Sequence, residues 1–203
     1  MQLSTPDFIV GIGGSAGGLD AYKELLDALP SSTGMAFVII SHIWPAYNSL
    51  LAEILSRHTK MRVLNASSEM RVHANHVYVL TANTDLTIEG DMLNVVSPRS
   101  VSNAQIDIFF SSLAIAKQAR AIGVVLSGYD GDGALGCRRI KENGGTTFAQ
   151  DNSAEVDHMP LAAQATGCVD FVMSPRAIAA ALARLSSAAT RKAKSGVPGA
   201  GRK

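Results

Sequence analysis

Ser15 stands in a glycine-rich segment whose residue types fit two kinds of chemistry. Gly13-Gly14-Ser15-Ala16-Gly17 has the G-x-S-x-G pattern, in which a sharp turn between a strand and a helix exposes a nucleophilic serine. The same segment contains Gly11-x-Gly13-x-x-Ala16, which satisfies the dinucleotide-binding fingerprint. The two patterns predict different functions, namely hydrolysis through a serine and binding of a nucleotide.

The end of the second predicted strand separates these two functions. A dinucleotide site needs an acidic residue there, about 20 residues after the glycines, to bind the ribose hydroxyls. The strand over residues 35–40 ends instead in Ser41 and His42. Consecutive parallel strands often lie side by side and end at the same edge of the sheet, so the imidazole of His42 could reach the hydroxyl of Ser15. His42 therefore favours the hydrolase and weakens the case for a nucleotide site.

A third polar cluster follows the apolar run over residues 121–126. The segment Ser127-Gly128-Tyr129-Asp130-Gly131-Asp132-Gly133 carries two carboxylates in a glycine-rich turn. Serine, histidine and a carboxylate are the groups of a nucleophile, its general base and the residue that orients the base. Each also has a structural explanation: Ser15 as a helix N-cap, His42 as a hydrogen-bonded strand end, and either aspartate as the acceptor of an Asx turn.

The elements that must position these residues alternate between strand and helix along most of the chain. Apolar runs predict strands and helical spacing of apolar residues predicts helices, in nearly regular succession. This order predicts an α/β fold with a doubly wound, mostly parallel sheet and helices on both faces, a three-layer α/β/α arrangement. Residues 86–96 predict an antiparallel hairpin at one edge of the sheet, around the Glu89-Gly90-Asp91 turn. The expected helices lie near residues 19–29, 50–60, 106–120, 135–143, 161–166 and 175–188.

Composition narrows the class of protein further. The chain has 203 residues with 47% hydrophobic residues and a net charge of +1, which predicts one sizeable core over residues 1–188 and gives no sign of a nucleic-acid partner. Residues 189–203 are rich in glycine and basic residues and predict a disordered basic tail. No apolar run approaches the roughly 18 residues of a membrane span, so we expect a cytoplasmic protein without membrane insertion.

Cysteines and histidines give no sign of a disulfide or a metal centre. Cys137 and Cys168 lie far apart and lack the spacing of metal ligands, so both are expected to be reduced thiols. The histidines outside the predicted strand end also lack metal-ligand spacing joined to carboxylates. We therefore expect neither a metal nor another cofactor.

Four motifs in one order give the chain a specific resemblance. The sequence resembles the catalytic domain of the chemotaxis protein-glutamate methylesterase family, CheB, over about residues 8–185. The motifs that carry the resemblance are Gly13-Gly14-Ser15-Ala16-Gly17-Gly18, Ser41-His42, Leu126-Ser127-Gly128-x-x-x-Asp132-Gly133, and Phe148-Ala149-Gln150-Asp151 with Met159-Pro160 after it.

The resemblance implies an enzyme that hydrolyses glutamyl methyl esters on the cytoplasmic helices of chemoreceptors and often deamidates receptor glutamines. It implies that Ser15 is the nucleophile, His42 the base and Asp132 the orienting carboxylate, with Ala16, Tyr129 and Met159 near the site and Ala16 near the oxyanion. The phospho-receiver domain that the family usually carries upstream is not in this sequence, so a separate regulatory or receiver protein is a candidate partner. The alternative is a non-catalytic binding module that keeps the fold.

The chain departs from the family pattern at positions around the predicted site. The family commonly has methionine in place of Tyr129, glycine in place of Asp130 and glycine in place of His158. It often has basic residues before the aspartate that matches Asp107, where this chain has the neutral segment 103–105. These departures concern the features that would face the receptor and leave the three predicted catalytic residues in place.

Overall fold

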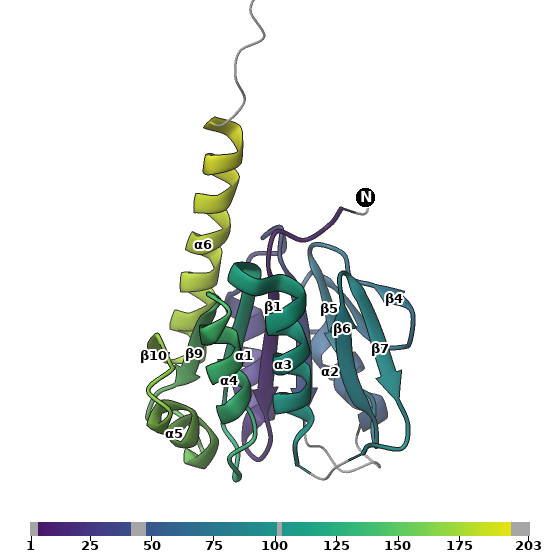
Figure 1. Ribbon diagram of the computed structural model, residues 1–203, viewed down its shortest axis with the longest axis vertical. Helices are drawn as coiled ribbons and strands as arrows, with labels where there is room; N and C mark the ends of the chain where they lie inside the picture. The colour runs from purple at the N-terminus through teal and green to yellow at the C-terminus, as the bar shows by residue number, and fades with distance from the viewer. Residues whose placement is uncertain (1–3, 42–47, 101–102, 196–203) are drawn as a thin grey trace, which may run out of the picture.

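A seven-stranded parallel sheet forms the centre of the molecule (Figure 1). The computed structural model describes residues 4–41, 48–100 and 103–195. The spatial order of the strands is β10-β9-β8-β1-β2-β5-β3, with β1 between β8 and β2. The strands are β1 (Ile9–Gly14), β2 (Ala36–Ser41), β3 (Arg62–Asn65), β5 (His76–Val79), β8 (Ala121–Val125), β9 (Thr146–Gln150) and β10 (Phe171–Met173).

Helices cover both faces of this sheet, and the central strands are mainly apolar because both of their faces are buried. In β2, Phe37 and Ile39 pack in one core cluster, whereas Val38 and Ile40 pack in the other. The first cluster contains residues of α1 (Gly18–Ala28), α2 (Asn48–Ser56) and α6 (Pro175–Ser195). The second contains residues of α3 (Gln105–Lys117), α4 (Ala134–Glu142) and α5 (His158–Ala165). The predicted doubly wound α/β fold is confirmed.

The predicted hairpin belongs to a separate antiparallel sheet. It consists of β6 (Asp85–Glu89) and β7 (Met92–Val96), and a short strand that the sequence did not predict, β4 (Met70–Arg71), pairs with β7. Leu86, Ile88 and Leu93 are buried in the same core cluster as the apolar face of α3. Because these side chains pack against a helix, the hairpin does not add strands to the parallel sheet.

Two helices differ in extent from the sequence prediction. Helix α5 begins at His158 rather than near residue 161, since Pro160 is tolerated in a first turn, where its missing N–H has no intrahelical acceptor. Helix α6 continues through Ser195, past the end expected at Ala188, because alanine, arginine and lysine favour helix and the chain reaches glycine only at Gly196. Residues 196–203 lie outside the described part, so a disordered tail there stays a prediction. Among the described helices, none has the length and apolar content needed to cross a bilayer.

Candidate functional site

Ser15 lies at the carboxyl end of β1, in a sharp turn that leads into α1. Its amide donates to the Ser127 carbonyl at 2.8 Å, and its carbonyl accepts the Gly18 amide at 2.9 Å, which closes the turn. Gly17 has φ 71°, a left-handed conformation that disfavours residues with a Cβ. The glycines predicted around the serine therefore form the strand, turn and helix that the G-x-S-x-G pattern requires, and Ser15 is left partly exposed.

Beneath this turn, the fully buried Ser127 connects three segments. Its amide donates to Gln150 Oε1 at 3.0 Å. Its Oγ lies 2.8 Å from the Ala16 carbonyl and accepts the Val156 amide at 2.9 Å. The turn after β1, the end of β9 and the loop after β9 are thus held together at the carboxyl edge of the sheet. The sequence did not single out Ser127 as a connecting residue.

The loop over residues 151–157 reaches the turn after β8, which packs against the Ser15 turn. The Gly128 amide donates to the Val156 carbonyl at 2.9 Å, and the Met159 amide donates to the Gly128 carbonyl at 3.0 Å. A Cβ built on Gly128 would lie 1.9 Å from Met159 Sδ and 3.1 Å from Ser15 Cβ. Gly128 therefore lies between Met159 and Ser15, which brings Met159 close to the Ser15 turn.

An aromatic pair lies at the rim of the same region. The rings of Tyr129 and His158 meet edge to face with centroids 5.6 Å apart, and His158 Nδ1 lies 3.1 Å from the Tyr129 carbonyl. The Tyr129 residue is 64% exposed. Tyr129 directly follows Gly128, at which a built Cβ would lie 3.1 Å from Ser15 Cβ, so the backbone of Tyr129 is close to the Ser15 turn. Tyr129 can thus form part of a surface that a substrate would meet.

The two aspartates of the turn after β8 have different surroundings. Asp132 is 4% exposed, and its carboxylate accepts the backbone amides of Ile106 at 2.9 Å, Asp107 at 2.8 Å and Gly133 at 2.9 Å. Asp130 accepts the Asp132 amide at 3.1 Å, which is an Asx turn. A carboxylate offers about four acceptor positions, and three backbone amides are enough to fix the orientation of Asp132.

His42, the base predicted from the sequence, lies outside the described residues. The residues just before Ser15 and His42 are register partners, because β1 and β2 pair Gly14 with Ser41. Close by, the buried hydroxyl of Tyr22 donates to the Ile40 carbonyl at 3.4 Å, and burial raises the pKa of this phenol, so it remains neutral. In the described ranges, no group of three or more histidine, cysteine or acidic residues could hold a metal ion.

Comparisons with known proteins match nearly all of this fold. The family model for CheB methylesterase matches residues 10–182. A putative protein-glutamate methylesterase/protein-glutamine glutaminase of Leptospira interrogans is 34% identical over 178 residues, which are 86% of this chain and 92% of that protein. Protein-glutamate methylesterase/protein-glutamine glutaminase 1 of Bordetella avium is 37% identical over 161 residues, 77% of this chain, but this chain spans only 47% of its length. The crystal structure of the Thermotoga maritima CheB methylesterase catalytic domain superposes with a TM-score of 0.80 and 25% identity, covering 88% of this chain and 98% of that one.

Proposed function

Because the chain belongs to the CheB methylesterase family, we propose that it is a serine hydrolase that demethylates glutamyl methyl esters on chemoreceptors, with deamidation of receptor glutamines as a second reaction. In this proposal Ser15 is the nucleophile, His42 the general base and Asp132 the orienting carboxylate. The observation that carries it is the position of Ser15, which lies in a sharp turn at the carboxyl edge of the sheet. The register partners Gly14 and Ser41, which directly precede Ser15 and His42, support the assignment of the base.

The proposed reaction proceeds through an acyl-enzyme. Ser15 Oγ attacks the ester carbonyl while His42 takes its proton, and collapse of the tetrahedral intermediate releases methanol with the proton returned by His42. Water then attacks the acyl-enzyme by the same route and releases the glutamate side chain. With a glutamine substrate, ammonia leaves in place of methanol. The charge on Asp132, held among three backbone amides, stabilises the imidazolium that forms in each step.

The backbone N–H of Ala16 is the proposed oxyanion donor. In strand-turn-helix nucleophile sites, the residue after the nucleophile supplies this N–H. The Ala16 N–H belongs to the same peptide group as the Ser15 carbonyl, which accepts the Gly18 amide at 2.9 Å, so the orientation of this N–H is fixed by the turn. Removing one such donor costs about 10²- to 10³-fold in kcat in a serine protease, which indicates how much this turn can contribute.

Methylated chemoreceptor helices are the proposed substrate and the cytoplasm the proposed location. A separate regulatory or receiver protein is a further proposed partner. The alternative, a binding module without catalysis, uses the same fold and differs in the reactivity of Ser15.

A serine-reactive phosphonate and a methanol-release assay test the proposal together. The wild-type protein should be labelled at Ser15 and release methanol from methylated receptor membranes. Ser15→Ala should do neither, although its free energy of unfolding should match that of the wild type. The matched control is Ser32→Ala, an exposed serine in the loop between α1 and β2, which should behave as the wild type. Loss of a nucleophile typically costs several orders of magnitude in rate. If folded wild-type protein is not labelled, or Ser15→Ala stays within about tenfold of it, the proposal fails and the binding module is favoured.

A further inference from the structure

Asp107 and Asp132 each bind the first-turn amides of the other's helix. Asp107 is in the first turn of α3, and its Oδ1 accepts the amides of Gly133 at 2.9 Å and Gly136 at 2.7 Å, at the start of α4. Asp132 lies two residues before Ala134, where α4 begins, and its carboxylate accepts the amides of Ile106 and Asp107 at the start of α3. A carboxylate near a helix N-terminus satisfies amides that have no intrahelical acceptor and interacts favourably with the helix dipole.

This exchange connects Asp107 to the proposed catalytic carboxylate through a shared donor. The Gly133 amide lies 2.9 Å from both Asp107 Oδ1 and Asp132 Oδ1. If the Asp107 acceptor is removed, the Gly136 amide loses its side-chain acceptor and the Gly133 amide loses one of two. The turn that carries Asp132 is then held less firmly to α3. The hydrogen bonds from the α3 amides to Asp132 remain, whereas those from the Gly133 and Gly136 amides to Asp107 are lost.

The charge of Asp107 is not what this connection requires. Burial raises the pKa of the Asp107 carboxyl, and the neighbouring carboxylates of Asp132 and Asp130 raise it further, although the amides of Gly136 and Gly133 oppose this shift. Both amides bind the same oxygen, Oδ1, which the carbonyl oxygen of an asparagine could replace. The acceptor and the charge can therefore be separated by substitution.

We propose that Asp107 is a positioning residue, which fixes the orientation of the Asp132 carboxylate through the Gly133 amide by means of its acceptor oxygen and not its charge. This inference rests on the proposed function, in which Asp132 orients the catalytic base. It predicts that removal of the acceptor lowers kcat and that its conservative replacement restores it. Displacing a catalytic group by about 1 Å can cost about 100-fold in rate.

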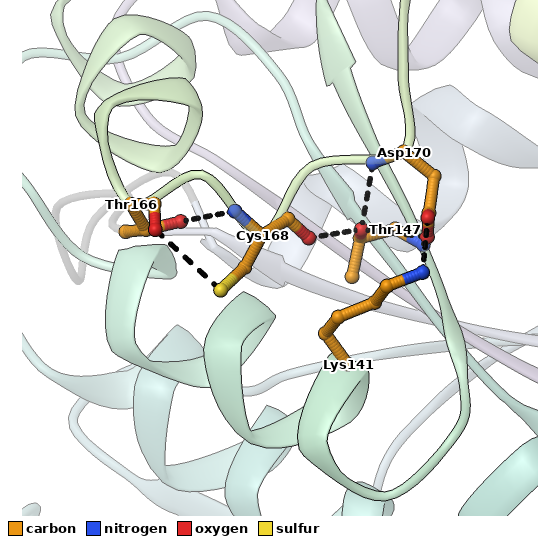
Figure 2. Close-up of polar contacts among 5 residues, drawn as sticks. All are labelled: Lys141, Thr147, Thr166, Cys168 and Asp170. Carbon is orange, nitrogen blue, oxygen red and sulfur yellow. Dashed lines mark hydrogen bonds and ion pairs between the residues drawn. The ribbon is translucent and has the colours of Figure 1, made fainter.

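The test compares Asp107→Ala and Asp107→Asn with a control carboxylate at the opposite edge of the sheet. Asp170 is that control: it accepts the Thr147 amide at 3.0 Å and Thr147 Oγ1 at 3.1 Å, and it pairs with Lys141 (Figure 2). Asp107→Ala should lower kcat roughly 10- to 100-fold with little change in KM, and Asp107→Asn should keep at least about a third of the wild-type kcat. Asp170→Ala should lose stability but keep its kcat per folded molecule.

Equal kcat losses per folded molecule in Asp107→Ala and Asp170→Ala would overturn the inference, and so would failure of Asp107→Asn to restore kcat. If Asp107→Ala does not fold, Asp107→Ser decides: its hydroxyl is a shorter acceptor, so an intermediate kcat supports the inference and an unchanged kcat overturns it.

A measurement without substrate separates this inference from the proposed function. Hydrogen exchange at the Ile106 amide, which donates to Asp132, should accelerate relative to global unfolding in Asp107→Ala but not in Asp170→Ala. If the wild type hydrolyses no ester, the proposed function fails, and the exchange result still decides whether Asp107 holds Asp132 in place. Unchanged exchange at Ile106 overturns the inference even where hydrolysis is intact.

Discussion

Gly128→Ala is a small substitution that should affect both stability and the Ser15 turn. The new Cβ would lie 1.9 Å from Met159 Sδ and 2.9 Å from Met159 Cγ, distances at which atoms must move. Met159 is fully buried, so its thioether cannot move into solvent without displacing its neighbours. The backbone at Gly128 is anchored on both sides, by its amide to Val156 and by its carbonyl to Met159, so the peptide cannot easily shift instead.

The expected cost follows from the contacts. Adding a methyl group to a well-packed site typically costs about 1–3 kcal/mol. Met159→Ala alone should cost about 2–5 kcal/mol, because it removes a buried side chain and leaves a cavity. In the double variant the methyl group introduced at position 128 occupies space that the thioether has left. The free-energy loss should therefore be smaller than the sum of the two single losses by about 1 kcal/mol or more, within the usual range for residues in contact.

Urea unfolding of the two single variants and the double variant measures this coupling. Hydrolysis should not recover along with stability in the double variant, since the methyl group still lies 3.1 Å from Ser15 Cβ. If the two losses add to within about 0.5 kcal/mol, the contact between residues 128 and 159 does not control packing here, and the reasoning is refuted.

Three further predictions concern charged groups. Asp132→Asn should remove most ester hydrolysis whereas Asp130→Asn, which alters the acceptor of an Asx turn, should not, and the opposite ranking of kcat would assign the orienting role to Asp130. Burial raises the pKa of Asp170, but its hydrogen bonds, led by that from Lys141, outweigh this and hold it below the usual range. The stability that the Asp170 carboxylate contributes is therefore present above its unfolded pKa of about 3.9 and is lost as pH falls through the folded value. Asp170→Asn should be less stable than the wild type at pH 7, and this difference should disappear in acid. Urea unfolding across a pH series measures it. Because residues 103–105 are neutral, methanol release from receptor membranes should change little with ionic strength, and a steep fall with salt would reveal electrostatic capture by other residues.

The parts of the fold that could be predicted are those written in local pattern. The continuous apolar runs of β2 and β8 and the glycines around Ser15 each specify their own conformation, and the structure has a strand or a sharp turn at each. The hairpin was predicted by the same reasoning from the turn at Gly90, which has φ 55°. Its separation from the main sheet was not, because that depends on α3, which packs against it from a later part of the chain.

The network around the candidate site could not be predicted, because its partners are distant in sequence. Ser127 Oγ is 111 residues from the Ala16 carbonyl that it contacts, and Asp132 is 26 residues from the Ile106 amide that it binds. A serine or an aspartate in a glycine-rich turn gives no sign of which backbone groups it will meet. The catalytic roles of Ser15, His42 and Asp132 stay predictions, and the experiments above test those of Ser15 and Asp132.

The departures from the family pattern affect the rim of the site rather than the contacts that hold it together. Tyr129 is anchored through its carbonyl, which any residue would supply, and its ring extends to the surface against His158. Asp130 uses its carboxylate to accept the amide two residues on, which shapes the turn itself. The contacts that orient Asp132 go instead to backbone amides of α3 and α4. We therefore expect substitutions at Tyr129, Asp130 or His158 to alter the surface at the rim while the contacts that orient Asp132 are preserved.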